Sequence, residues 1–394
     1  LSYNFLDVAF SPNNDHWCTR HKSFLTAVLG PKRIQLFSHA REFEISHTIK
    51  SLSQASSFPV NLEEKVFALV DGIVCMVAFG RNYQGNHFRG QKFKEVIFEI
   101  MKMMDNFYAE NFFPHLGWVV DILTGVRKRL KQCFHNLGDF FERVLEEEHL
   151  DPARLKSDRE EDLVDSLIAL LNDQATDSLC PSKEHIKAIL LNVFIGGMDT
   201  PVVAIVWAMS ELVKNPLVMQ KLQAEIRNCF LRKAALDVDD LTKLTYLKMV
   251  VKETLRMYPP VPLLIPHEAI HRCKIGGSNS YDVLPKARVL INAWAMGRHS
   301  SIWTNPHEFY PEGFEGNNID FRGQHFELLP FGAGRIICPA SGLASSTMGL
   351  ALANLLNHFD WELPGGMKRE DIDMEEGGVT MHGKTALYLV PIKY

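Results

Sequence analysis

The sequence lacks the features that mark secreted, nucleic-acid-binding and membrane-spanning proteins. Its seven cysteines are an odd number and include no Cys-x-x-Cys pair, so we expect reduced thiols on the cytosolic side and no disulfide framework. The net charge is only -5, which argues against a nucleic-acid partner. The one long apolar run, 188–212, has Asp199 and Pro201 at its centre, which favours a buried core helix over a membrane span.

The sequence also lacks three common catalytic signatures. It contains no Gly-x-Ser-x-Gly turn, no phosphate-binding loop and no dinucleotide fingerprint. A redox enzyme with this sequence would therefore take its electrons from a partner protein. The chain opens with Leu1 instead of Met and carries no signal peptide or N-terminal anchor, so we expect a piece of a longer protein or the product of a shortened gene.

Apolar periodicity predicts a mainly helical chain. Helices are expected over 15–29, 32–56, 61–79, 92–107, 126–149, 162–173, 182–213, 215–231 and 239–258. Loops are expected at 79–91 and 151–162. After Pro259 the pattern changes to prolines, turns and short strands, one of them expected over 287–295, with a hairpin expected at the end of the chain. No polar linker separates independent cores, so we predict one large helical domain over 1–394, mainly α with small β sheets (α+β).

The stretch 331–340, FGAGRIICPA, carries the strongest chemical signal. Gly332 and Gly334 permit positive φ and a close approach of the backbone to a bound group. An apolar helix is expected to follow, so Cys338 would lie just before a helix N-terminus, where N–H groups and the helix dipole favour a thiolate. A thiolate held in this way suits haem iron as an axial ligand. On this stretch alone, a buried structural cysteine fits equally well.

The long helix is interrupted in composition at 195–201, IGGMDTP. Two glycines, an acid, a hydroxyl and a proline are costly inside a helix, which tolerates them best where it must open. Pro201 has no N–H, so the carbonyl of Gly197 loses its helical donor. The opened groove would hold water, Thr200 and Asp199, and could deliver protons to an oxygen bound nearby. The alternative is a kinked core helix with a capped polar site.

Two further patterns need structural context. Glu253 and Arg256 are three residues apart on a predicted helix, a spacing that allows a salt bridge. The stretch 267–271, HEAIH, matches the zinc-protease motif H-E-x-x-H. That chemistry needs both histidines on one face of a stable helix and a third ligand. Four prolines precede the stretch and glycines follow it, so we expect strand and turn here and reject a protease site.

Together, these motifs resemble those of the cytochrome P-450 superfamily. The family's haem-ligand loop, F-x-x-G-x-R-x-C-x-G, is matched at Phe331, Gly334 and Cys338. The family's oxygen-activation motif, E-x-x-R pair and PPVP turn precede this loop in the chain, in the order and spacing of the family. Stretches such as KETLRMYPPVPLLIP and NPHEFYPE are similar to the plant microsomal type, whose members oxidise specialised (secondary) metabolites. The resemblance covers nearly the whole chain.

The resemblance implies a haem-thiolate monooxygenase that inserts one atom of dioxygen into a small apolar molecule. The cofactor would be haem b (iron protoporphyrin IX) with Cys338 as the iron ligand, and Asp199 and Thr200 would carry protons to dioxygen. Further haem contacts are implied for Trp17, His21, His267, Phe331, Gly332, Gly334 and Ala340. The substrate pocket is implied at Phe194, Gly197, Val261, Leu263, Leu264, Thr380 and Met381. Glu253 and Arg256 would be structural.

The resemblance also implies partners and a location. Electrons would come from an NADPH-dependent P-450 reductase, and the full-length form would lie on the cytosolic face of the endoplasmic reticulum membrane. Relative to the family pattern, this chain lacks the N-terminal anchor and the first segments that line the substrate pocket.

Several family arginines are replaced in this chain. His267, Gly313 and Ile336 stand at three arginine positions, the helix start near Trp17 has lost two basic residues, and Ala340 replaces a glycine. Burying unpaired haem carboxylates costs several kcal/mol each. One alternative is therefore a P-450-like protein with impaired haem binding, a scaffold or a truncated copy without catalysis. A haem-thiolate isomerase or dehydratase is a third, which the retained Asp199 and Thr200 argue against.

Overall fold

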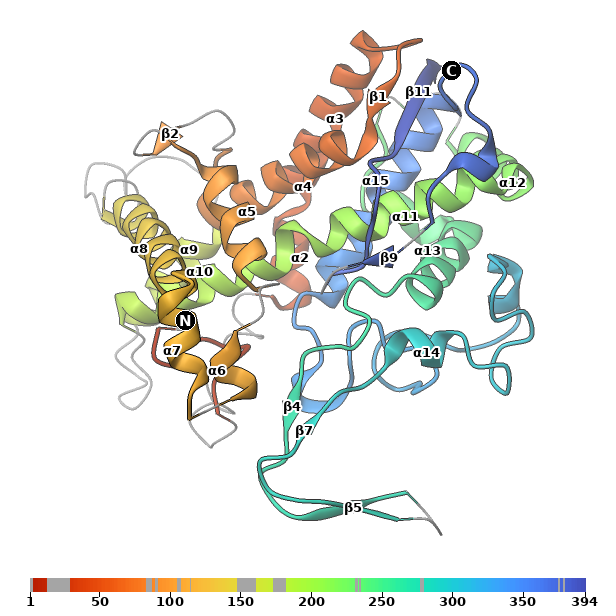
Figure 1. Cartoon of the computed structure of the whole chain (residues 1–394). Coiled ribbons are helices and arrows are strands. Elements are labelled where there is room, and N and C mark those ends of the chain that lie inside the picture. The colour runs from red at the N-terminus through yellow and green to blue at the C-terminus, as the bar shows by residue number, and fades with distance from the viewer. Residues whose placement is uncertain are drawn as a thin grey trace. The chain divides into compact units, whose positions relative to one another are not determined.

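The structure is a computed structural model of the whole chain (Figure 1). It divides into two compact units, which we describe separately. The described residues are 3–12, 29–82, 87–88, 91–104, 108–113, 115–146, 161–172, 182–230, 233, 235–276, 280–374, 376–377 and 380–394. The predicted helix at 15–29 lies almost wholly outside them. The fold class is confirmed, because the described chain is mainly helical with small antiparallel sheets.

The first unit comprises residues 1–48 and 64–199. Its helices are α2 (Pro31–Leu36), most of α3 (Ser38–Gln54) and of α4 (Leu62–Phe79), α5 (Phe93–Met104), α6 (Ala109–Phe112), α7 (Gly117–Leu123), α8 (Val126–Val144), α9 (Leu163–Asn172) and α10 (Lys183–Met198). A short strand pair, β2 (His87–Phe88) with β3 (Gln91–Lys92), lies in the predicted loop at 79–91. Two signals set helix starts here, a left-handed Gly125 before α8 and a capping box of Ser182 and His185 at α10.

The core of the first unit contains a cluster of phenylalanine rings. Phe79 of α4 stacks on Phe194 of α10, with ring centroids 5.3 Å apart, and Phe140 and Phe141 of α8 pack around them. Phe194 and Phe141 are completely buried. Aromatic rings bury large apolar areas in such pairs, so this cluster joins three helices that are distant in sequence.

The second unit comprises residues 49–63 and 200–394. Its helices are α11 (Thr200–Lys214), α12 (Pro216–Cys229), η2 (Asp240–Lys243), α13 (Thr245–Met257), α14 (Ala293–Gly297), η3 (Pro311–Phe314), η4 (Gly334–Ile336), α15 (Ser341–His358) and η5 (Arg369–Asp371). Helices α11, α12, α13 and α15 pack against one another. Buried residues occupy nearly all of α11 and most of α15. For α11 this agrees with the core helix predicted for the apolar run 188–212.

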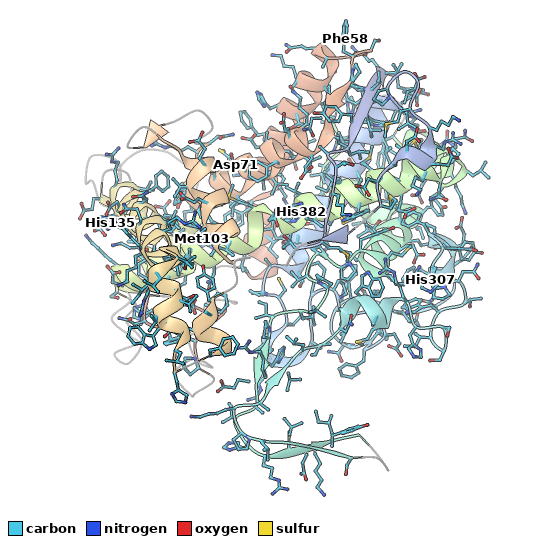
Figure 2. All side chains as sticks on the ribbon, in the orientation of Figure 1. Phe58, Asp71, Met103, His135, His307 and His382 are labelled. Atoms are coloured by element: carbon cyan, nitrogen blue, oxygen red, sulfur yellow. The ribbon has the colours of Figure 1, made fainter. Side chains whose placement is uncertain are left out.

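The strands of the second unit form one three-stranded sheet and three pairs. The sheet has the order β1 (Val60–Asn61), β11 (Tyr388–Lys393), β8 (Phe359–Glu362), all antiparallel. The pairs are β4 (His267–Glu268) with β7 (Arg288–Val289), β5 (Cys273–Ile275) with β6 (Tyr281–Val283), and β9 (Glu376–Gly377) with β10 (His382–Gly383). The β5–β6 hairpin holds its side chains in solvent, all but Val283 exposed (Figure 2).

Three expectations about local structure were wrong. The end of the chain is not a hairpin, because β10 pairs with β9 while β11 pairs with β1 and β8. The second half of the predicted strand at 287–295 is helix α14, which Asn292 caps by accepting a hydrogen bond from Ala295 N–H at 2.9 Å. Unbroken helices were expected over 32–56 and 239–258, but they are divided at Phe37 into α2 and α3 and at Leu244 into η2 and α13.

One helical stretch among the described residues, Lys183–Lys214, has the length and apolarity of a membrane span. It is interrupted at Asp199, which follows the end of α10 at Met198, and Thr200 begins α11. The interruption lies where the sequence predicted that the helix opens. Most of α11 is buried, as is common for core helices of folded domains.

Candidate active site

The cysteine loop, 331–340, lies in the second unit. It contains η4, and Cys338 lies between η4 and α15. Gly332 and Gly334 both have left-handed backbone, with φ of 72° and 69°, which glycine adopts without steric cost. The loop closes through a hydrogen bond of 2.8 Å from Cys338 N–H to the carbonyl of Phe331. The Phe331 ring packs edge-on against Phe321, with centroids 5.4 Å apart. The glycines therefore fold the loop back so that Cys338 precedes α15, as predicted.

Cys338 is a free, half-buried thiol. Burial raises the pKa of this thiol above its ordinary value, and the backbone N–H of Ala340, which caps the start of α15, only partly opposes this effect. The expectation that the helix terminus favours a thiolate is therefore not met by the polypeptide alone. A bound metal cation would reverse the balance, because coordination deprotonates a thiol.

The loop residues fit an apolar group bound through a single thiolate. A Cβ atom added to Gly334 would have no other atom within 4 Å, so the backbone of Gly334 faces open space. Ile336 is 49% exposed, and Leu263 and Ile265 on the segment after α13 are exposed too. A soft thiolate with apolar side chains nearby is a donor set that suits haem iron.

Leu264 connects the segment after α13 to the loop. It is a non-glycine residue with positive φ, 51°, a conformation that costs of order 1 kcal/mol or more for a leucine. Its Cδ1 lies 3.9 Å from where a Cβ on Gly332 would be. Such strain persists only where surrounding contacts impose it, so the path of 261–264 against the loop is fixed by the fold.

The remaining predicted haem contacts are in part outside the described residues. The two that lie outside are Trp17 and His21. His267 is half-buried on β4, where it pairs with Val289. This strand geometry confirms the expected strand at 267–268 and is incompatible with a helical H-E-x-x-H zinc site. Among the described residues no group of three His, Cys, Asp or Glu is placed to hold a metal ion.

The predicted proton-transfer residues lie at the helix interruption. Asp199 is 3% exposed and follows the last residue of α10, and Thr200 is half-buried at the start of α11. Gly196 is exposed, with open space where a Cβ would lie, and Gly197 faces Val74 at 3.4 Å. The two glycines therefore leave the backbone of α10 bare immediately before the acid and the hydroxyl.

Glu253 and Arg256 form a buried, two-pronged ion pair. Arg256 Nε lies 2.6 Å from Glu253 Oε2 and Nη2 lies 2.8 Å from Oε1. The guanidinium also donates to the carbonyls of Gly297, Pro306 and Glu308 at 2.5–3.0 Å. Glu253 Oε1 in turn accepts the backbone N–H of Tyr310 at 2.7 Å. Both members of the pair thus make hydrogen bonds to the backbone as well as to each other. This supports the predicted structural role.

The residues predicted to line the substrate pocket have different surroundings. Val261, Leu264 and Thr380 are half-buried, Leu263 is exposed, and Met381 is buried. The two segments that carry them are joined directly, because Met381 N–H donates to the carbonyl of Pro260 at 3.0 Å. Phe194, by contrast, is fully buried in the aromatic cluster of the first unit, so it could line a pocket only if that cluster opened.

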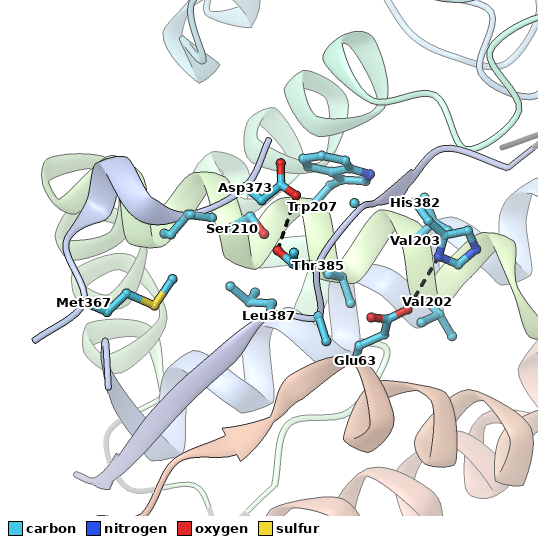
Figure 3. A pocket seen from close by; sticks show the side chains of 14 residues that line it. Glu63, Val202, Val203, Trp207, Ser210, Met367, Asp373, His382, Thr385 and Leu387 are labelled. Carbon is cyan, nitrogen blue, oxygen red and sulfur yellow. Dashed lines mark hydrogen bonds and ion pairs between the residues drawn. The ribbon is translucent and has the colours of Figure 1, made fainter. Parts of the chain in front are cut away.

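A small cavity lies within the second unit between α11 and the segments 367–373 and 382–387 (Figure 3). Its volume is about 30 Å³, room for roughly two water molecules and too little for an organic substrate. Its polar wall includes Glu63, which lies 3.6 Å from His382, and Asp373, which accepts from Thr385 at 3.4 Å.

Trp207 and Tyr258 were missed by the sequence analysis. They stack face to face in the second unit, with centroids 4.2 Å apart and an interplanar angle of 4°. The available signal was a tryptophan within an otherwise aliphatic helix and a tyrosine immediately before two prolines. Neither pattern shows that the two rings meet.

Comparisons with known proteins identify the family. The family model described as cytochrome P450 matches residues 3–390. The chain is 47% identical to 2-methylbutanal oxime monooxygenase of Manihot esculenta and 48% identical to parthenolide synthase of Tanacetum parthenium, over its whole length and 76% and 77% of theirs. It is 44% identical to 4-hydroxyphenylacetaldehyde oxime monooxygenase of Sorghum bicolor, covering 74% of that protein.

The fold agrees with this family. A zebra fish cytochrome P450 solved with abiraterone superimposes with a TM-score of 0.79 at 20% identity, over all of this chain and 86% of that one. At that identity the likeness concerns the fold alone, whereas the plant relatives share the sequence as well. The chain belongs to the cytochrome P450 family, and it is a haem-thiolate monooxygenase of the plant type.

Proposed function

We propose that this chain inserts one atom of dioxygen into an apolar plant metabolite of the oxime or terpenoid class and releases the other atom as water. Two electrons and two protons balance the reaction. The observation that carries the proposal is the Cys338 loop. It presents a free thiol just before α15, and two glycines with left-handed backbone allow the loop to close. The oxime and parthenolide names of the plant relatives support the substrate class.

The cofactor in this proposal is haem b. Cys338 would bind its iron, and the backbone of Gly332 and Gly334 would leave room beside it, with Phe331 and Ala340 supporting the loop and Trp17, His21 and His267 near the carboxylates. Haem held by a thiolate supplies the redox chemistry that splits dioxygen. Apolar side chains around the loop would exclude water.

The protein's own contribution to the chemistry is proton transfer and substrate placement. Asp199 would hold a proton at its carboxyl group and pass it to the Thr200 hydroxyl, whose rotating O–H can accept and donate in turn. Val261, Leu263, Leu264, Thr380 and Met381 would hold the substrate's apolar surface. Phe194 and Gly197 are proposed as further pocket residues by resemblance alone.

We also propose an NADPH-dependent P-450 reductase as the electron donor and the cytosolic face of the endoplasmic reticulum membrane as the location. The first unit supports a membrane surface, because the segment 113–123 exposes large apolar side chains. The most exposed of these are Phe113 at 63%, Leu116 at 73% and Leu123 at 80%. Exposed apolar residues grouped in this way favour contact with a membrane or partner.

That residues 1–394 act as one domain remains a prediction.

A second candidate function is a P-450-like scaffold with impaired haem binding. Ile336 favours it, because it is half exposed beside Cys338 where the family has an arginine, and isoleucine cannot pair with a haem carboxylate. The intact Glu253–Arg256 pair favours the enzyme instead.

Turnover with a reductase separates the two candidates. Purified protein, haem, P-450 reductase and NADPH would be incubated with 2-methylbutanal oxime or 4-hydroxyphenylacetaldehyde oxime, and product and NADPH oxidation measured together. We expect product from wild type, and a Thr200→Ala variant that oxidises NADPH but yields about tenfold less product per NADPH. Haem retention without product from either oxime or from terpenoid substrates would refute the proposed substrate class.

A further inference from the structure

The Trp207–Tyr258 stack is a buried aromatic pair of the second unit that the proposed mechanism does not use. Trp207 of α11 is 2% exposed and Tyr258, directly after α13, is 5% exposed. Parallel rings 4.2 Å apart are in full van der Waals contact and resist sliding. Each ring also carries a polar group that must find a partner when buried.

The indole N–H of Trp207 finds its partner on the backbone of the segment that precedes β10. It donates to the carbonyl of Met381, and Met381 N–H donates to the carbonyl of Pro260 at 3.0 Å. Figure 3 shows Trp207 on α11 together with His382, the residue after Met381. The backbone of Met381 is therefore held from two sides, by α11 and by the proline turn after α13.

The phenol of Tyr258 is held on the same helix as Trp207. Its hydroxyl donates to Glu211 Oε1 at 2.6 Å, one turn along α11 from Trp207. Glu211 also accepts from the side chain of Asn215 at 2.9 Å. On the other side, the guanidinium of Arg298 lies 5.4 Å from the Tyr258 ring centroid and donates to the carbonyl of Met257. The hydroxyl thus ties Tyr258 to α11, while its ring is held by the stack on Trp207 and by Arg298, contacts that a phenylalanine would keep.

The stack lies between the two segments assigned to substrate contact. Pro260 begins the run into 261–264, whose Leu264 is held in left-handed conformation against the cysteine loop. Met381 and Thr380 belong to the other segment. The Trp207 N–H is the point at which α11 holds the second segment, whereas the Tyr258 hydroxyl, removed in the control variant below, donates to Glu211 on α11 itself.

We propose that Trp207 is a positioning residue for substrate recognition, which fixes the segment 380–381 relative to 261–264 and so sets the width of the substrate pocket. This inference rests on the proposed function. It predicts that removing the indole N–H changes which substrate shape is preferred, with the haem site left intact.

The test compares two variants that each keep an aromatic stack. Trp207→Phe removes the N–H to Met381, and Tyr258→Phe removes the hydroxyl to Glu211 and serves as the matched control. Amide hydrogen exchange over 378–384 is measured on the full chain, along with dissociation constants of 2-methylbutanal oxime and 4-hydroxyphenylacetaldehyde oxime. Haem binding in each variant is checked by the carbon monoxide spectrum of the reduced protein.

For Trp207→Phe we expect amide exchange at Met381 and His382 to rise about tenfold, and the ratio of the two dissociation constants to change about fivefold, the effect of one hydrogen bond. For Tyr258→Phe both should stay within about twofold. Unchanged exchange and ratio in Trp207→Phe, or equal changes in the two variants, would overturn the proposal. If wild type binds neither oxime, the proposed substrate class fails, and exchange at Met381 alone decides the positioning role.

Discussion

Two of the three positions in the second unit where an arginine of the family pattern is replaced, Gly313 and Ile336, differ in what takes over the role of the lost charge. At the Glu253–Arg256 pair, Gly313 stands at the arginine position, yet Tyr310 N–H satisfies Glu253 and three carbonyls satisfy Arg256. At the cysteine loop, Ile336 replaces the arginine and is half exposed. An arginine whose hydrogen bonds a backbone N–H can make instead, as at Gly313, can be lost without cost. An arginine that must neutralise a cofactor's carboxylate, as expected at Ile336, cannot.

The largest effect should follow from breaking the compensated site. Arg256→Ala would leave Glu253 buried without its partner and three carbonyls without a donor, so we expect a loss of about 3–5 kcal/mol in the free energy of unfolding. Urea denaturation measures it. The control is Arg272→Ala, which removes an exposed pair with Asp282 and should cost less than about 1 kcal/mol. Similar losses in both variants would contradict the account.

Restoring the two arginines should have unequal effects on haem retention. Ile336→Arg supplies a cation beside Cys338, so we expect haem to dissociate about tenfold more slowly, measured by transfer to apomyoglobin. Gly313→Arg is the matched control, because a Cβ there would meet only Tyr310 at 3.7 Å and Glu253 already has its partners. Its dissociation rate should stay within about twofold. A greater slowing of haem dissociation in Gly313→Arg than in Ile336→Arg would contradict the view that only the cysteine loop needs its arginine.

The smallest effect concerns pH and the buried Glu211. Burial raises the pKa of this carboxyl in the folded state above its ordinary value of 4.5, so the folded protein binds the proton more tightly than the unfolded chain does. The stabilisation is complete below pH 4.5 and is lost as the pH rises through the folded-state pKa.

The stability of wild type relative to Glu211→Gln should therefore fall as the pH rises across this range, measured as urea midpoints. A constant offset between the two proteins would show that Glu211 titrates normally.

The sequence predicted the fold class and most helix positions, because long amphipathic segments such as 126–149 carry strong periodicity. It also predicted the interruption at Asp199, where Pro201 and two glycines act locally. It failed where pairing is decided at a distance. The partners of β11 are β1 and β8 instead of β10, and nothing in the local pattern of the chain end encodes that choice.

The site shows the same division. Cys338 and its glycines were identified from spacing, since their conformation is a local property. The backbone groups around Arg256 could not be predicted, because they come from a segment 41–52 residues away and their amino-acid identity does not matter. The stack of Trp207 on Tyr258 likewise depends on how α11 packs against α13.

The measurement that tests the account most directly is the absorption spectrum of the haem-loaded, reduced chain under carbon monoxide. We predict the red-shifted Soret band of a thiolate-ligated haem in wild type and in Cys273→Ala, which removes an exposed thiol elsewhere in the unit. The band should be lost in Cys338→Ala. A wild-type chain without the band, or a Cys338→Ala variant that keeps it, would contradict the assignment of Cys338 as the ligand and favour the scaffold.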